Sequence, residues 1–341
     1  MNESQMAREI REIPDVVVRQ TREGLETYRA IGARLRALDP QVLVTSARGS
    51  SDHAALYLKY LVETRIGIPV ASVGPSVASI YAAPLRLHGA ALVAISQSGA
   101  SPDLLALLEA GRAGGALTAA LVNAPDAPAA NLVEMSAPLL AGPEVAVAAT
   151  KTYVASLVAA AAIVAEWARD ETLAEALPVL PEALSAALAC DWSAVEEAFG
   201  TADSAFCISR GPALTIAYEA ALKLKETCRL HAEGFSAAEV LHGPAVLAGE
   251  RLRALVFAPA DAARASVLET ARRMAGFGTG VWLVDSAGGG ANVAQSVPAP
   301  HPALVPACQA VSFYRFVERL SRARGCDPDR PAHLSKVTRT L

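Results

Sequence analysis

The sequence predicts an α/β protein built from two similar lobes, each a parallel sheet flanked by helices in a three-layer αβα arrangement. Short apolar runs typical of buried strands alternate with longer helical stretches along the 341 residues. The pattern of the first half returns in the second at one constant offset, from 48 to 210, from 95 to 257 and from 123 to 285. Hydrophobic residues make up 52% of the chain, which is enough to fill the cores of about two domains.

In the first half, strands are expected at 41–47, 91–96 and 116–123. Helices are expected at 50–63 and 101–114, directly after the first two strands. Such an order of strand, helix and strand is typical of a parallel sheet, because the chain must cross back to the end of the sheet where the previous strand began before it can form the next one.

The second half repeats this order, with apolar runs near 205, 253 and 279 and a long helix expected over 215–234. Three ungapped coincidences carry the repeat: Arg48-Gly49 with Arg210-Gly211, Ile95 with Phe257, and Leu121-Val122-Asn123 with Leu283-Val284-Asp285. We therefore expect an internal duplication. The expected boundaries are an N-terminal helical arm (1–25), a first domain (26–172), a connector (173–193), a second domain (194–325) and a C-terminal tail (326–341).

Composition argues against several classes of function. The net charge is only −4 and no dense Lys/Arg cluster occurs, so nucleic-acid binding is not expected. The five cysteines show no paired spacing, which argues against disulfides and a zinc site, and no metal site is expected. The charged N-terminus lacks a secretory pattern, and the apolar stretch 154–167 is too short to cross a bilayer. We expect a cytoplasmic protein without a membrane segment.

Two serine-rich loops are predicted where strands of the first half feed helices. Ligands of parallel sheets bind beyond the carboxyl ends of the strands, and hydroxyls together with a helix start can hold phosphate without a lysine. The residues concerned are Ser50, Ser51, Ser96, Gln97, Ser98 and Ser101. In the second half, Ala258, Pro259, Ala260 and Asp261 replace the second loop, so the hydroxyls are not required merely to join strand to helix. The alternative is that these serines only cap helices. Neither GxxxxGK[ST] nor GxGxxG occurs at these loops, so no nucleotide cofactor is expected.

Titratable residues gather in the second half of the chain. Glu219, Lys223 and Glu226 share one face of the expected helix, and His231, Glu233, Glu239 and His242 follow closely. For the helical residues the alternative is an ordinary solvated face with surface ion pairs. For His242, spacing alone fits a loop histidine as well as a catalytic one.

Five strings together resemble the isomerase half of glutamine:fructose-6-phosphate amidotransferase and its relatives with two sugar-isomerase (SIS) domains. They are SQSG (96–99), VAATKTY (147–153), EAALKLKE (219–226), HAEGFSAAEVLHGP (231–244) and DPDRPAHLSKVTRT (327–340). With EIREIPDVV near the N-terminus, the resemblance covers nearly the whole chain. It implies two tandem SIS domains.

The resemblance also implies roles for individual residues. The hydroxyl loops, through Ser51, Ser96, Gln97, Ser98 and Ser101, would hold the phosphate of a sugar. Glu226 would move a proton between C1 and C2 with Lys223 beside it, His242 would assist ring opening in the site of a neighbouring subunit, and Lys336 would form a Schiff base with the keto sugar. Such a base, acid and amine need no cofactor. Val147 and Ala149 would be further substrate contacts, and a homodimer with shared active sites is expected.

The sequence differs from the amidotransferases in two features that narrow the expected function. No glutaminase domain or N-terminal nucleophilic cysteine precedes the lobes, so we expect the chain not to draw ammonia from glutamine. Ala149 stands where the amidotransferases have serine. The strings are most similar to those of stand-alone SIS-type glucosamine-6-phosphate deaminases, which implies conversion of glucosamine 6-phosphate to fructose 6-phosphate and ammonia.

Two alternatives stay open from sequence. One is another phosphosugar reaction, either an isomerase acting on a different hexose phosphate or a deglycase acting on an amino-acid adduct of fructose 6-phosphate. The other is a non-catalytic phosphosugar-binding regulator. Retention of Glu226, His242 and Lys336 argues against the regulator.

Overall fold

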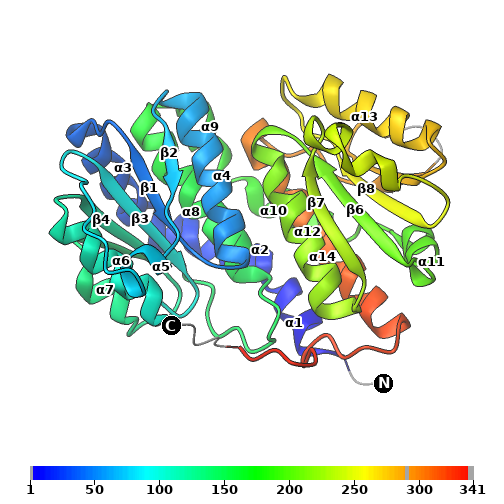
Figure 1. Ribbon diagram of the computed structural model, residues 1–341, viewed down its shortest axis with the longest axis horizontal. Helices are drawn as coiled ribbons and strands as arrows, with labels where there is room; N and C mark the ends of the chain where they lie inside the picture. The colour runs from blue at the N-terminus through cyan, green and yellow to red at the C-terminus, as the bar shows by residue number, and fades with distance from the viewer. Residues whose placement is uncertain (1–2, 289–291, 337–341) are drawn as a thin grey trace. The chain divides into compact units, whose positions relative to one another are not determined.

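The structure is a computed structural model that describes residues 3–288 and 292–336 (Figure 1). The chain divides into two compact units, which we call the first and second lobes. Within the described residues, the first lobe comprises 15–144, 151–178 and 335–336, and the second comprises 3–14, 145–150 and 179–334. Each lobe therefore contains segments that are distant in sequence.

The first lobe contains a five-stranded sheet in the order β2-β1-β3-β4-β5, and every neighbouring pair is parallel. Its strands are β1 (Leu43–Ser46), β2 (Val70–Ser72), β3 (Ala91–Ser96), β4 (Leu117–Val122) and β5 (Met135–Pro138). All residues of β1, β3 and β4 are buried, as expected for strands covered by helices on both faces.

Two groups of helices cover this sheet. One group consists of α3 (Leu25–Leu38), α4 (Ser50–Arg65) and α8 (Lys151–Ala168), which pack on one another. The other consists of α5 (Ser76–Ser79), α6 (Pro102–Ala113) and α7 (Pro128–Leu132). Alternate strand residues such as Leu92 and Ala94 pack with Leu104, Leu107 and Leu108 of α6. The lobe also contains the π-helix η1 (Gln20–Gly24), most of α2 (Ile13–Arg19), and α9 (Glu171–Ala176).

Helix α8 is the central helix of the first lobe. It is long and apolar enough to cross a membrane by length and composition, but 89% of it is buried inside the protein, as in a core helix. It packs closely on α3 at Gly32, where an added Cβ would lie 2.4 Å from the carbonyl oxygen of Ile163. This close approach requires glycine at position 32.

The second lobe has the same topology, with strand order β7-β6-β8-β9-β10 and only parallel pairs. Its strands are β6 (Ser204–Ser209), β7 (His231–Ser236), β8 (Leu252–Phe257), β9 (Gly280–Asp285) and β10 (Val293–Gln295). Its helices are α1 (Gln5–Arg11), α10 (Leu180–Ala187), α11 (Ser193–Gly200), α12 (Leu214–Cys228), α13 (Arg264–Gly276) and α14 (Val305–Ala323). Short 3₁₀ turns are η2 (Gly211–Ala213), η3 (Glu239–His242), η4 (Pro244–Leu247) and η5 (Pro302–Leu304).

The shared strand order confirms the predicted class of two α/β lobes related by an internal repeat. The prediction of one helix over 215–234 is wrong at its end. Helix α12 stops at Cys228, where Arg229 adopts a left-handed conformation with φ 50°, and the chain then pairs with β6 as β7. The glutamate-rich pattern continued past the helix end, so periodicity alone did not mark the stop.

The contact at Gly32 leads to a stability prediction. Gly32→Ala should lower the free energy of unfolding by about 1–3 kcal/mol, because the new methyl group overlaps backbone atoms of α8. Gly200→Ala is the matched control, since it ends helix α11 with open space around the added Cβ, and should stabilise by about 0.4–1 kcal/mol. Urea unfolding of both variants measures the difference, and equal effects would contradict the packing argument.

Candidate functional site

The serine-rich loops of the first lobe leave two adjacent strands. Ser50 and Ser51 begin α4 directly after β1, and Ser96 to Ser101 connect β3 to α6. Strands β1 and β3 are neighbours in the sheet. After β1 the chain continues to β2 on one side, and after β3 it continues to β4 on the other side, so the carboxyl ends of β1 and β3 form the switch point of the sheet. The structure thus brings all six residues predicted to bind phosphate to the position where ligands of such sheets bind.

An ion pair that sequence reasoning missed ties the two loops together. The Arg48 guanidinium, in the loop before α4, donates to the buried carboxylate of Asp103 at the start of α6, at 2.8 and 3.1 Å. Arg48 lies in the internal repeat and Asp103 in the helix expected over 101–114, but nothing in their spacing indicated the contact. The pair links the two loops and engages the Arg48 guanidinium.

Backbone contacts shape the loop between β3 and α6. The Ser96 hydroxyl accepts a hydrogen bond from the N–H of Gly99 at 2.9 Å, and the Ser98 hydroxyl accepts one from Ala100 at 3.3 Å. Gly99 has φ 58°, and a Cβ there would lie 2.7 Å from the Cβ of Ala127, so the turn requires glycine. A hydroxyl that accepts a backbone bond still has its own proton to donate. The loop is therefore shaped in advance to present donors to an anion.

The capping alternative does not describe Ser101. This residue occupies the N-cap position of α6, yet its side chain makes no capping hydrogen bond. The residue at the N-cap of α4 is Gly49, which has no side chain to cap with. Ser51, Gln97, Ser98 and Ser101 are partly exposed, whereas Ser50 and Ser96 are buried. The exposed hydroxyls and the starts of two helices can together receive a phosphate.

The equivalent end of the second sheet carries carboxylates in place of hydroxyls. The Asp261 carboxylate accepts the N–H of Ala263 at 2.9 Å, and Arg264 binds Asp285 through two hydrogen bonds of 2.6 and 2.9 Å. Burial raises the pKa of Asp285, but hydrogen bonds from Arg264 and from the N–H of Ala287 outweigh this and hold the pKa below its usual value. Asp261 thus places a carboxylate in the loop that has lost the hydroxyls, and this charge disfavours an anion there.

The titratable residues of α12 form a buried charge cluster in the second lobe. The Lys223 ammonium lies 2.5 Å from the Glu226 carboxylate and 3.6 Å from that of Glu219, which also accepts a 2.9 Å hydrogen bond from the hydroxyl of Tyr314 on α14. The Lys223 side chain is 1% exposed and that of Glu226 is 22% exposed. The alternative of a solvated helix face is therefore wrong, and Glu226 is the member of the cluster that solvent can reach.

His242 ends the 3₁₀ turn η3 in the second lobe and is exposed. Within the described part of the chain it forms no hydrogen bond or ion pair. Val147 and Ala149 belong to the segment 145–150 of the same lobe, whose outward positions 145, 147 and 149 alternate with buried ones. Both residues are half-exposed, so their surfaces are accessible to a ligand.

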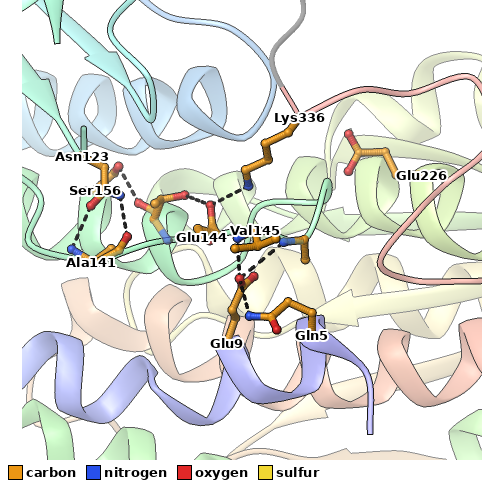
Figure 2. A network of polar contacts seen from close by, with 12 residues as sticks. Gln5, Glu9, Asn123, Ala141, Glu144, Val145, Ser156, Glu226 and Lys336 are labelled. Carbon is orange, nitrogen blue, oxygen red and sulfur yellow. Dashed lines mark hydrogen bonds and ion pairs between the residues drawn. The ribbon is translucent and has the colours of Figure 1, made fainter. Parts of the chain in front are cut away.

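Lys336 lies in the first lobe beside a buried carboxylate that sequence reasoning missed. Its ammonium donates to Glu144 at 3.1 Å, and the Glu144 side chain is fully buried (Figure 2). Glu144 also accepts the N–H of Thr152 at 3.1 Å and its hydroxyl at 2.7 Å. One signal was available, since Glu144 is the single charged residue between Glu134 and Lys151. No group of His, Cys, Asp and Glu within residues 3–288 and 292–336 is arranged to hold a metal ion.

Comparison with known proteins places this geometry in a family. The SIS domain model matches residues 39–165. A glutamine–fructose-6-phosphate aminotransferase of Zymomonas mobilis is 31% identical over 97% of this chain and 58% of its own length, and one of Bradyrhizobium diazoefficiens is 34% identical over 85% and 50%. The chain thus spans about half to three fifths of these curated relatives.

Solved structures match over nearly the whole length of both chains. A candidate phosphosugar isomerase of Silicibacter pomeroyi is 45% identical, with a TM-score of 0.92, over 96% of this chain and all of the other. The C-terminal domain of the Francisella tularensis aminotransferase has a TM-score of 0.87 at 23% identity, over 97% of this chain and 99% of the other, a likeness of fold. The sequence match, the repeated sheet topology and the switch-point loops agree, and the chain belongs to the family of SIS domain proteins that includes the isomerase half of these aminotransferases.

Proposed function

We propose that the protein is a phosphosugar isomerase that converts glucosamine 6-phosphate and water into fructose 6-phosphate and ammonia. The observation that carries this proposal is the Glu226 carboxylate, accessible to solvent and held by the buried ammonium of Lys223. A carboxylate of this kind can remove the weakly acidic proton next to a carbonyl group. The candidate phosphosugar isomerase of Silicibacter pomeroyi, 45% identical to this chain, supports the substrate class. A Thermotoga maritima glucosamine-6-phosphate deaminase, 17% identical with a TM-score of 0.75, shares the fold.

The phosphate of the substrate is proposed to bind at the switch point of the first lobe. Hydroxyls of Ser51, Ser98 and Ser101 and the amide of Gln97 donate to its oxygens, and the helix starts add favourable dipoles. Binding energy at this group, remote from the reacting carbons, orients the sugar for the chemical step.

The isomerisation step moves one proton between neighbouring carbons. His242 assists opening of the sugar ring, and Glu226 then removes the proton from C2 and returns it to C1. As C1 becomes CH₂OH, its oxygen gains a proton and the C2 amine loses one, so the product is an imine at C2. The Lys223 ammonium, 2.5 Å from the Glu226 carboxylate, holds the base in place.

Release of ammonia is proposed to use Lys336. The neutral amine of Lys336 adds to C2 and ammonia leaves; water then hydrolyses the resulting Schiff base and frees the lysine. Before attack the Lys336 ammonium must lose a proton, and the Glu144 carboxylate 3.1 Å away is positioned to accept it. Val147 and Ala149 are proposed to contact the sugar, with a methyl group at Ala149 instead of a hydroxyl. These steps require acid–base groups and an amine but no cofactor.

We propose that the protein acts in the cytoplasm as a homodimer. All five cysteines are free, which suits a reducing compartment. His242 is exposed and without a polar partner in the described residues, which suits a role on substrate bound to the second copy.

The base can be tested by one conservative change. Glu226→Gln should lower kcat for glucosamine 6-phosphate by ~100-fold or more, since the amide cannot accept the C2 proton. Affinity for the phosphate group should remain, because the serine loops are unchanged. Glu233→Gln, an exposed glutamate on β7, is the control. Full turnover by a folded Glu226→Gln variant would rule out the assignment.

The phosphate loop can be tested separately. Ser98→Ala should weaken fructose 6-phosphate binding by about 10- to 100-fold, the loss of a hydrogen bond to a charged group. Ser266→Ala removes a hydroxyl of the second lobe that donates to a backbone carbonyl, and should leave binding unchanged. Isothermal calorimetry with fructose 6-phosphate gives both affinities; unchanged binding by Ser98→Ala would place the phosphate elsewhere.

A substrate panel tests the reaction itself. Amino and non-amino hexose 6-phosphates, each assayed for ammonia and for ketose, should yield both products from glucosamine 6-phosphate. Ketose without ammonia from a non-amino sugar would indicate a plain isomerase, and binding without turnover of any sugar would indicate a regulator.

A further inference from the structure

Helix α1 carries a buried glutamate that holds the segment 145–150. The Glu9 side chain, which is fully buried, accepts hydrogen bonds at Oε1 from the backbone N–H groups of Val145 and, at 3.4 Å, Ala146 (Figure 2). The side chain of Gln5, one turn earlier, donates to the same oxygen at 3.0 Å. Figure 2 shows the Glu9 carboxylate directed from α1 toward this segment.

The same helix also binds the C-terminal tail. The Asp329 carboxylate accepts the N–H groups of Gln5 and Met6, both at 2.7 Å, at the start of α1. The carbonyl oxygen of Asp329 accepts the N–H of Val147 at 3.4 Å. All these residues belong to the second lobe. Helix α1, the segment 145–150 and the tail therefore form one closed set of contacts.

Backbone hydrogen bonds, rather than side-chain packing alone, define the path of the segment. The Val145 side chain is 65% exposed, and Val147 and Ala149 are half-exposed, so these outward side chains cannot anchor it. Helix α1 itself is anchored by Met6 and Ile10, which are buried. Bonds from N–H groups to a buried carboxylate are stronger than bonds between neutral groups. Glu9 thus transmits the fixed position of α1 to the segment.

We propose that Glu9 is a positioning residue, which sets the place of Val147 and Ala149 and, together with Asp329, fixes the base of the tail that carries Lys336. The inference rests on the proposed function, because it assumes that these residues meet the sugar. It assigns a role to the N-terminal helix, which supplies none of the residues proposed to contact the sugar. A displacement of about 1 Å at reacting groups can cost about 100-fold in rate, so a positioning residue can matter without contacting substrate.

Three variants of α1 test the assignment. Glu9→Ala leaves both N–H groups without their acceptor, and should lower kcat/KM for glucosamine 6-phosphate by about 10- to 100-fold. Glu9→Gln keeps a carbonyl oxygen that can accept, and should retain most of the activity. Arg8→Ala is the matched control, because Arg8 lies on the exposed face of the same helix and, among the described residues, its side chain hydrogen-bonds to Gln5 and Glu3 and not to the segment 145–150. Equal losses in Glu9→Ala and Arg8→Ala would overturn the proposal.

Two further measurements distinguish positioning from general destabilisation. Hydrogen exchange at the amides of Val145 and Ala146 should rise in Glu9→Ala and stay unchanged in Arg8→Ala. Affinity for inorganic phosphate should stay at the wild-type value, since the serine loops belong to the first lobe. A Glu9→Ala variant that loses phosphate binding and activity together, with exchange raised throughout, would show a purely structural role and overturn the proposal.

A double-mutant cycle tests whether Glu9 and Asp329 act as one unit. If both act through α1, the loss in kcat/KM of Glu9→Ala with Asp329→Ala should be close to the larger single loss. A double variant whose loss in kcat/KM equals the product of the two single losses would contradict a shared mechanism. If the wild-type protein acts on no amino sugar phosphate, the proposed function fails but the structural contact is untouched. Unchanged hydrogen exchange at Val145 and Ala146 in Glu9→Ala would refute the contact itself.

Discussion

The right-handed crossover between parallel strands is the constraint on which the candidate site depends. Each lobe places its strands in one order, with the chain moving outward from the first strand in one direction and from the third in the other. Crossovers between parallel strands are right-handed as a rule, so helices that follow two strands leaving in opposite directions belong to opposite faces of the sheet, and the loops diverge at its carboxyl end. Loops that diverge leave a depression lined by helix starts. The serines of the first lobe occupy that depression because of topology, not because of any contact among themselves.

The two lobes differ in the charge of the loops that line this depression, and this charge favours an anion in the first lobe and disfavours it in the second. In the first lobe, Asp103 is turned inward to pair with Arg48, and hydroxyls line the loops. In the second lobe, Asp261 and Asp285 lie at the same edge, and Arg264 neutralises only one of them. The duplicated fold thus retained its layers while charges at a few loop positions diverged, consistent with function depending on sites carried by a fold.

Sequence predicted the layers better than the polar contacts. The repeat and the apolar strands reflect local patterns, and the predicted serine loops lie where expected. Edge strand β7 was missed because a single left-handed residue, Arg229, ends α12 inside a continuous charged pattern. The pairs Arg48–Asp103, Glu144–Lys336 and Glu9–Val145 join positions far apart in sequence, so neither spacing nor propensity could reveal them. Burial of Lys223 was equally hidden, since its helical spacing is the same on a solvated face.

The bond between the N-terminal helix and Asp329 has a consequence for the order in which the protein can be completed. The backbone N–H of Gln5 and the carboxylate of Asp329 are separated by 324 positions along the chain. Domains generally fold as units while synthesis proceeds from the N-terminus. Helix α1 cannot follow that order, because the lobe to which it belongs is largely encoded in the second half of the chain. The strands of the first sheet are therefore synthesised between α1 and Asp329, and α1 can bind Asp329 only after that sheet has been made.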